Sequence, residues 1–277
     1  MSEELLEGIK KFTQRADNAL NSILEKRKDI PESARYILMG GGKRIRATLV
    51  YAVAEHYGTA DERSDKVACA LEMIHAYSLI HDDLPCMDDD DFRRNKPSCH
   101  KVYGEAEALL AGDGLLTLAF EILFGDYTPG LFKAGGYIAR CAGFSGMVGG
   151  QYMEITDKAY NEETLGIIDK GKTCALICAA ILGSAYAVKE DLEEKEAELW
   201  ERFAGDFGMA FQLKDDLLDI SETDEGGPSF VAVCGKEKTE ELLYHYTNKC
   251  YEALSALGEK IDGIIWKLVE FNAERAK

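Results

Sequence analysis

The sequence contains few prolines, few tryptophans and few basic residues. Of its 277 residues, 5 are proline and 2 are tryptophan, and 32 lysines and arginines stand against 50 aspartates and glutamates. The formal net charge is therefore −18 at pH 7. This charge argues against nucleic acid and anionic membranes as partners, because both attract basic surfaces. A chain this acidic that binds an anionic substrate must gather its cations at one place or use a metal ion.

Eight cysteines are present, but none belongs to a Cys-x-x-Cys pair or to the cysteine and histidine spacing of a zinc site. We therefore expect reduced thiols and a cytoplasmic protein. The first residues show no basic segment followed by an apolar stretch, and no run approaches the roughly 18 apolar residues of a membrane-spanning helix. The sequence predicts no stable membrane insertion.

Apolar residues recur at three- and four-residue spacing over long stretches, as at Val67, Ala70, Leu71 and Ile74. This is the period of an α-helix, and alternating strand patterns are lacking. Besides the helix through Val67, we predict helices over residues 3–25, 43–57, 104–124, 132–151, 163–187, 191–219 and 238–273. Short breaks, none long enough for a domain linker, fall at the glycine and proline clusters 40–42, 95–97, 128–130 and 226–228. The predicted fold is all-α, a single-domain helical bundle over residues 1–277.

Two clusters of aspartates stand out. The first runs from Asp82 to Asp91, and the second consists of Asp215, Asp216 and Asp219. Asp215 and Asp219 share a helix face, where two carboxylates among apolar neighbours are costly unless a cation lies between them. Magnesium prefers such oxygen ligands and bridges carboxylates to phosphates. The alternatives are a solvated acidic turn, or a calcium loop, whose alternating ligands and central glycine neither cluster has.

The basic residues gather first in the segment GGGKRIR at residues 40–46, where three cations follow a glycine run at an expected helix start. Exposed backbone amides, a helix N-terminus and fixed cations together form an anion site. Lys43 and Arg46 share a helix face, whereas Arg44 points elsewhere. His75 lies two helical turns before the first aspartate cluster, on nearly the same face. The alternatives are a solvated basic cap and, for His75, an ordinary core histidine.

Several ordered segments resemble a known family. LEMIHAYSLIHDDLPCMDDDDFRRNKPSCH at 71–100 and FQLKDDLLD at 211–219 resemble the two Asp-rich motifs of the trans-isoprenyl diphosphate synthases, in particular the bacterial-type farnesyl diphosphate synthases. Further segments fall in the family's order: GGGKRIR, AGDGLL at 111–116, Gly150-Gln151 and GKT at 171–173. The resemblance covers residues 35–220. It implies a helical bundle around a deep central cavity, usually as a homodimer.

The resemblance also implies roles for individual residues. Isopentenyl diphosphate would be bound by Lys43, Arg46, His75 and Arg94. The allylic diphosphate would be bound by Arg93, Lys172, Thr173 and Gln212. Magnesium, with three ions in the substrate complex, would be ligated by Asp82, Asp88 and Asp215, with Asp83, Asp216 and Asp219 ligating or supporting. The residues expected to act in catalysis are Asp82, Asp88, Asp215, Lys172 and Arg93.

The chemistry implied by the family explains these residue types. Metal and cations stabilise the charge that builds on the departing diphosphate, and the allylic group ionises. The alkene of isopentenyl diphosphate then attacks the allylic cation, and a proton is lost to the released diphosphate. This reaction needs no side-chain nucleophile, in agreement with the lack of a recognisable catalytic triad.

Two positions bear on product length. Tyr77 and Ser78 lie five and four residues before Asp82, where a helix faces the cavity that receives the growing tail. In the family, a bulky aromatic residue at this position stops elongation at fifteen carbons, so Tyr77 favours (2E,6E)-farnesyl diphosphate, made from dimethylallyl or geranyl diphosphate. The alternatives are a geranylgeranyl diphosphate synthase and, for Tyr77, ordinary core packing.

The sequence departs from the family pattern after the second Asp-rich motif. The family carries lysines in a loop here, whereas residues 220–235 contain neither lysine nor arginine, and Lys236 and Lys238 look like the start of the next helix. Weaker allylic binding in an active enzyme is one interpretation. Another is a non-catalytic regulatory subunit of a heteromeric synthase. A terpene cyclase is disfavoured, because it does not need the predicted isopentenyl site.

Overall fold

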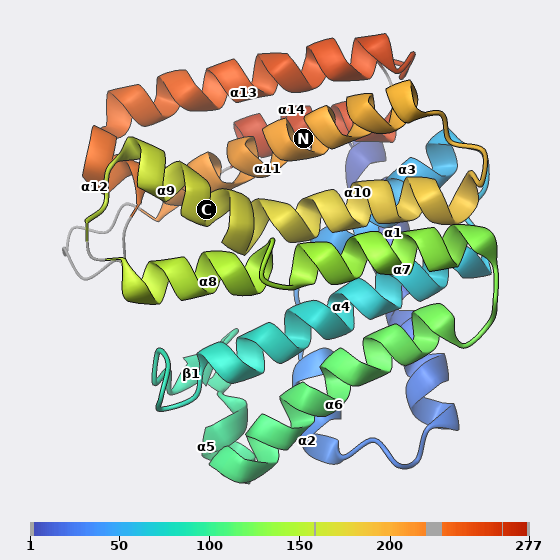
Figure 1. Ribbon diagram of the computed structural model, residues 1–277, viewed down its shortest axis with the longest axis vertical. Helices are drawn as coiled ribbons and strands as arrows, with labels where there is room; N and C mark the ends of the chain where they lie inside the picture. Colours follow the sequence, from blue (N-terminus) through green and yellow to red (C-terminus); the bar gives the residue numbers. More distant parts are fainter. Residues whose placement is uncertain (1–2, 158, 220–228, 262, 276–277) are drawn as a thin grey trace.

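The computed structural model describes residues 3–157, 159–219, 229–261 and 263–275. Within these ranges the fold is all-α, as predicted, except for one antiparallel pair of two-residue strands (Figure 1). The helices are α1 (Glu3–Lys26), α2 (Glu32–Leu38), α3 (Ile45–His56), α4 (Glu62–Asp82), α5 (Cys99–Tyr103), α6 (Glu105–Phe124), α7 (Pro129–Ala142), α8 (Met147–Thr156), α9 (Glu162–Asp169), α10 (Ala175–Val188), α11 (Glu194–Leu218), α12 (Phe230–Cys234), α13 (Lys236–Ala256) and α14 (Ile264–Glu274). The strands are β1 (Phe92–Arg93) and β2 (Lys96–Pro97), and a π-helical turn, η1 (Lys170–Cys174), joins α9 to α10.

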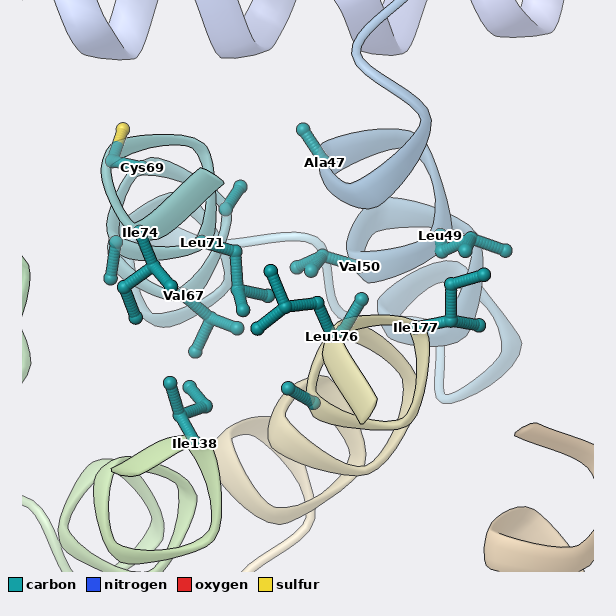
Figure 2. Packing of buried hydrophobic residues seen from close by; sticks show 14 of the residues in the cluster. Ala47, Leu49, Val50, Val67, Cys69, Leu71, Ile74, Ile138, Leu176 and Ile177 are labelled. Atoms are coloured by element: carbon teal, nitrogen blue, oxygen red, sulfur yellow. The ribbon is translucent and has the colours of Figure 1, made fainter. Parts of the chain in front are cut away.

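Helix α10 forms the centre of the bundle. It contacts α3, α4, α7 and α11, and nearly all of its side chains are buried. Figure 2 shows Leu176 of α10 between Leu71 of α4 and Val50 of α3, with Ile138 of α7 close by. A helix that is apolar on every side needs neighbours on every side, and these four helices provide them.

The continuous helix Glu162–Val188, formed by α9, η1 and α10, is long and apolar enough to span a membrane by length and composition. This differs from the sequence expectation that no stretch reaches that length. Of its most apolar window, 72% is buried inside the fold. Packing in the centre of the bundle therefore accounts for its composition.

Several predicted boundaries are wrong, and glycines explain two of them. The helix predicted over 132–151 is interrupted between Ala142 and Met147, where a Cβ added to Gly146 would lie 2.0 Å from the carbonyl oxygen of Cys141. The helix predicted over 238–273 is interrupted after Ala256, and Gly258 follows with φ of 75°. The short helices α2 and α5 were not predicted, because five to seven residues show too little periodicity. The break predicted at 226–228 lies outside the described residues.

Both aspartate clusters lie at the same end of the bundle. Helices α4 and α11 run so that their C-terminal ends, at Asp82 and Leu218, point to the left in Figure 1. The π-helical turn η1 and the C-terminal half of α8 approach the same end. Segments far apart in the sequence therefore bring their polar residues to one place.

Candidate active site

The four residues predicted to bind isopentenyl diphosphate line one cavity of about 600 Å³, which we call the cationic cavity. It lies between the start of α3, the middle of α4, the β1–β2 turn and α11. Its lining residues are Gly40, Gly42, Lys43, Arg44, Ile45, Arg46, Glu72, His75, Arg94, Asn95, Thr173, Ile177 and Phe211. An anion that enters this cavity meets cations from two separate segments, residues 43–46 and the β1–β2 turn.

The glycine run before α3 allows Arg94 to reach this cavity. Gly41 and Gly42 have φ of 92° and 133°, a conformation that other residues rarely adopt. A Cβ at Gly42 would lie 2.9 Å from the guanidinium carbon of Arg94. Nη1 of this arginine donates a hydrogen bond to the carbonyl oxygen of Gly41. Arg94 and Asn95 also have positive φ, in the tight turn between β1 and β2. The glycines therefore serve the approach of this arginine as well as the turn itself.

Arg44 and Arg46, two residues apart, are in opposite electrostatic situations. The Arg44 guanidinium is buried, with nitrogens 3.0 Å from the carboxylates of Asp17 and Glu72 and 2.8 Å from the carbonyl oxygen of Leu38. The Nε of Arg46 is buried and has no hydrogen-bond partner among the described residues. Burial lowers the pKa of Arg46, although Glu72 opposes the shift. Arg44 thus has a structural role, in agreement with the prediction that it points away from the helix face of Lys43 and Arg46. Arg46 still has a hydrogen-bond donor that can bind an anion.

His75 lies beside the cations of the cationic cavity, and it also borders apolar side chains. Burial and the neighbouring Arg46 and Arg94 lower its pKa well below the usual value. The imidazole is therefore neutral at pH 7, and it can accept or donate a hydrogen bond without adding charge. This differs from an ordinary core histidine, because the ring lines the cationic cavity.

A second cavity of about 450 Å³, which we call the apolar cavity, adjoins the first and shares Arg46, His75 and Thr173 with it. Its lining residues are Arg46, His75, Tyr77, Ser78, Leu79, His81, Asp82, Met87, Met147, Val148, Gln151, Tyr152, Ile155, Lys172 and Thr173. Tyr77 is 6% exposed and packs edge-on against His81. Both residues predicted to control product length therefore lie in the wall of this cavity.

Among the aspartates of the first cluster, Asp82 lines the apolar cavity. Burial raises its pKa to about 6, Asp88 contributes to the increase, and Lys172 opposes it. The backbone amide of Asp88 donates a 2.9 Å hydrogen bond to the carbonyl oxygen of Asp82, so the chain folds back and brings the two aspartates together.

Asp83 has different surroundings. Its side chain is fully buried and accepts a 2.8 Å hydrogen bond from Nε of Arg93. Nη2 of the same arginine donates a 2.9 Å hydrogen bond to Asp90. Its Oδ2 has no hydrogen-bond partner among the described residues. This arrangement fits the supporting role rather than direct contact with the apolar cavity, and it fixes Arg93 beside Asp82.

The second cluster is engaged by other parts of the chain. Asp215 lies 2.7 Å from Nη1 of Arg275. Asp216 accepts hydrogen bonds from the backbone amide of Phe230, at 2.7 Å, and from the side chain of Gln212, at 2.8 Å. Burial raises the pKa of both carboxyls, and these donors oppose the shift. Asp219 ends α11 as its C-cap.

The π-helical turn η1 positions Lys172 and Thr173. A Cβ at Gly150 would lie 2.2 Å from the backbone nitrogen of Lys172, so glycine is required where α8 meets η1. In this close approach Lys172 forms an ion pair with Glu154 of α8. The conspicuous Gly150 and Gly171 of the sequence thus have a packing reason.

Three residues near the site were not predicted from the sequence: Glu154, Asp169 and Arg275. Asp169 is 7% exposed, and its Oδ2 lacks a hydrogen-bond partner within the described ranges. Burial raises its pKa to about 7, and Asp216 and Glu154 add to the shift. The sequence did contain one indication of a role for Asp169, since this acidic residue lies three residues before Lys172 in an otherwise apolar helix. Arg275 gave none, because its partner is 60 residues away in sequence.

The carboxylates of this site suit magnesium. Within the described residues, no three acidic, histidine or cysteine side chains converge on one point. Magnesium does not need such a cage, because it keeps waters and completes its shell with substrate phosphates. The donors are hard oxygens, and the raised pKa of Asp82 marks a carboxylate that a cation would stabilise. The residues present therefore fit the ion.

The segment in which the sequence lacks basic residues is described only in part. Residues 220–228 lie outside the described residues, and α12 occupies Phe230–Cys234. Lys236 and Lys238 belong to the first turn of α13, as predicted. Neither lysine lines the two cavities.

A cationic cavity joined to an apolar one, with carboxylates beside their junction, defines a site for diphosphates that carry apolar tails. Comparisons with known proteins agree with this class. Residues 27–229 match the family model of the polyprenyl synthetases. The chain is 39% identical over 236 residues to a farnesyl diphosphate synthase of Bacillus subtilis (strain 168), covering 81% of this chain and 79% of that protein. It is 44% identical over 224 residues to a geranylgeranyl diphosphate synthase of Cyanophora paradoxa, covering 78% and 73%.

A solved structure is also similar over nearly the whole chain. A geranyltransferase from Legionella pneumophila matches with a TM-score of 0.89 and 32% identity, over 99% of this chain and 98% of that one. The chain therefore belongs to the polyprenyl synthetase family, and it is a prenyltransferase of the trans-prenyl diphosphate synthase class. The relatives include farnesyl and geranylgeranyl diphosphate synthases, so similarity to them does not select a product length.

Proposed function

We propose that this protein condenses isopentenyl diphosphate with dimethylallyl or geranyl diphosphate and releases (2E,6E)-farnesyl diphosphate. The observation that carries the proposal is the junction of the two cavities. Asp82 and Lys172 lie in the wall of the apolar cavity, and Arg46, His75 and Thr173 line both cavities. A diphosphate in each position would bring the two reacting carbons together there.

The cationic cavity suits isopentenyl diphosphate. Lys43, Arg46 and Arg94 provide fixed positive charge. Nε of Arg46, which has no partner among the residues described, can donate a hydrogen bond to a phosphate oxygen. The neutral His75 adds a polar contact at the junction without repelling the cations. This is the binding role that the motif resemblance implies for the four residues.

The allylic diphosphate would lie between the two aspartate clusters. Bound magnesium would neutralise charge on the leaving diphosphate and so lower the barrier to ionisation. Lys172 would contact the same diphosphate after leaving Glu154, and Arg93 is held beside Asp82 by its contacts with Asp83 and Asp90. Thr173 and Gln212 lie close enough to the clusters to orient the substrate.

The apolar cavity has two tasks in this mechanism. It receives the hydrocarbon tail, and it excludes water from the allylic cation. The alkene of isopentenyl diphosphate must react with this cation before water does. The departing diphosphate then takes the proton that is lost. No side chain of the site is needed as a nucleophile.

Product length would be set by the wall of the apolar cavity. The buried Tyr77 presents a bulky aromatic ring there, backed by His81, and Ser78 lies next to it. Tail growth beyond fifteen carbons would have to displace this ring from a packed helix interface. This packing supports farnesyl over geranylgeranyl diphosphate.

The experiment is a product analysis of the purified chain with magnesium, isopentenyl diphosphate and dimethylallyl or geranyl diphosphate. We expect a fifteen-carbon product from the wild type and mainly a twenty-carbon product from Tyr77→Ala. Tyr152→Ala is the matched control, because Tyr152 lines the same cavity but is 64% exposed. A twenty-carbon product from the wild type would contradict the role of Tyr77. Substrate binding without any product would favour the non-catalytic regulatory subunit.

We also propose that the protein acts as a homodimer. Helix α6 is apolar on most of its surface, yet Leu109 and Leu110 are 46% and 68% exposed. Phe132 and Phe144 are also exposed. Such unpartnered apolar side chains suit a second copy of the chain. Sedimentation equilibrium should give a dimer for the wild type and a weaker one for Leu110→Glu; a monomeric wild type would refute this assembly.

The cytoplasmic location remains a prediction from the sequence.

A further inference from the structure

Arg275, the residue that follows α14, is unusually well fixed for a position so close to the end of the chain. Its side chain is 8% exposed. Nη1 lies 2.7 Å from Asp215, Nη2 donates to the carbonyl oxygen of Phe211 at 3.1 Å, and Nε donates to Asn272 at 3.0 Å. The guanidinium also stacks on the ring of Phe211, 4.4 Å from its centre. All three guanidinium nitrogens are therefore in use.

The partner of this arginine is the carboxylate that begins the second aspartate cluster. Burial raises the pKa of Asp215, and Arg275 is the largest opposing influence. The stacked Phe211 in turn lines the cationic cavity. Arg275 thus joins the end of the chain to a predicted metal ligand and to the wall of the substrate site.

We propose that Arg275 stands in for a metal ion at Asp215: it neutralises this carboxylate in the metal-free protein, and magnesium must displace it to bind. The inference rests on the proposed function, in which Asp215 is a metal ligand. It adds a competition between a side chain and the ion, so that Arg275 sets the metal affinity of the second aspartate cluster.

Charge and distance make the two cations competitors. Magnesium binds carboxylate oxygen at about 2.0–2.1 Å and tolerates little distortion. The guanidinium nitrogen already lies 2.7 Å from Oδ1 of Asp215. Two cations on one partly buried carboxylate repel each other, because solvent screens them poorly at that distance. Removing the arginine should therefore strengthen metal binding, whereas removing an ordinary structural anchor should not.

The position of Arg275 also allows its side chain to leave. The residue lies one position beyond Glu274, the last residue of α14, and its backbone is extended with ψ of 140°. Rotation of the side chain would break the contacts with Asp215, Phe211 and Asn272 without unwinding a helix. The metal must therefore overcome side-chain contacts rather than a change of fold.

The test is metal binding by Arg275→Gln, with Mn²⁺ alone as the probe and the free-ion signal read by electron paramagnetic resonance. We expect the apparent Mn²⁺ affinity to rise roughly fivefold, in line with the strength of partly exposed ion pairs. Arg275→Lys, which keeps the charge, should stay near the wild type. Arg202→Gln is the matched control, because Arg202 on α11 is 52% exposed, pairs with Glu252 and carries the same charge.

A double-mutant cycle locates the effect. In an Asp215→Asn background, Arg275→Gln should no longer change the affinity, because the contested carboxylate is gone. Unchanged or weaker Mn²⁺ binding by a folded Arg275→Gln protein would overturn the inference. The absence of Mn²⁺ binding in both wild type and variant would overturn it as well.

The product assay separates this inference from the proposed function. Farnesyl diphosphate formation together with unchanged metal affinity in Arg275→Gln would leave the function intact and refute the competition. Failure to form any prenyl product would refute the proposed function on its own.

Discussion

The two aspartate clusters look alike in the sequence, but they differ in their surroundings. Asp82 of the first cluster lines the apolar cavity, and burial raises its pKa to about 6. Asp215 and Asp216 of the second cluster are held by Arg275, by the amide of Phe230 and by Gln212. Asp82 therefore faces a cavity before substrate arrives, whereas Asp83, Asp215 and Asp216 are engaged by groups of the chain itself.

The same contrast separates two neighbouring arginines. Arg44 is buried between Glu72 and Asp17, while Nε of Arg46 has no partner in the part of the chain that the structure describes. A charged motif in the sequence thus marks where charge is concentrated. The fold decides which of its members are compensated by the protein and which are left for a ligand.

The largest expected effect is on turnover, where the two clusters should behave alike. Asp82→Asn and Asp215→Asn should each lower kcat by about 10³-fold, because each removes charge that holds the metal against the leaving diphosphate. Steady-state product formation measures this. Asp91→Asn is the control, since Asp91 is exposed and pairs with Lys101. A variant of either cluster that keeps a tenth of the wild-type rate would show that only one cluster acts in catalysis.

The two arginines should differ in what they stabilise. Arg44→Met should lower the free energy of unfolding by about 3 kcal/mol, because it leaves the nearly inaccessible carboxylate of Glu72 without its cation. Arg46→Met should change it by less than about 1 kcal/mol and should instead raise KM for isopentenyl diphosphate. Urea unfolding and substrate titration measure the two effects. Equal losses of stability would contradict the comparison.

Asp169 provides a pH-dependent test of an uncompensated carboxylate. Its pKa in the folded protein is about 7, above the usual value near 4, so the folded state binds the extra proton between these limits. Wild-type stability should therefore fall as pH rises from about 4 to 7. Asp169→Asn should remove this fall and gain about 2 kcal/mol at pH 8, discounted for partial exposure.

Denaturant unfolding at pH 5 and pH 8 checks the prediction for Asp169. The exposed Asp191 provides the control, because Asp191→Asn should leave the pH dependence unchanged. An identical pH slope in wild type and Asp169→Asn would show that this carboxyl is solvated in solution.

The smallest effect distinguishes the two clusters most directly. At pH 7, Asp82→Asn should raise the free energy of unfolding by about 1 kcal/mol, because ionising this carboxyl above its pKa of about 6 opposes folding. Asp215→Asn should raise it by less, because Arg275 offsets part of the cost of ionising this carboxyl. Thermal unfolding without metal gives both values. Equal gains for both variants would remove the contrast between the clusters.

Much of the fold could be predicted because the helices are long and periodic. Those through Val67 and over 104–124 lie where they were predicted, at Glu62–Asp82 and Glu105–Phe124. The interruption near Gly146 was missed, because a glycine inside an apolar pattern is compatible both with a continuous helix and with a break. The short helix α5 likewise depends on contacts with α2 and α6.

The site was predictable where a side chain has a local reason for its position. Lys43, Arg46, His75 and Arg94 follow recognisable motifs, and they do meet in one cavity. Glu154 and Arg275 were missed because nothing beside them in the sequence indicates an ion-pair partner. Long-range pairing of charges depends on which helices become neighbours, and no local pattern records this.

The sequence by itself determined the helical class, the concentration of acidic and basic groups in separate motifs, and the family. These follow from periodicity and residue type, which are properties of short segments. The tertiary structure alone decided that Asp83 supports Arg93, that Arg44 is structural while Arg46 is open, and that Arg275 occupies Asp215. The physical reason is that burial and pairing set the energy of a charge, and both depend on neighbours brought together by folding.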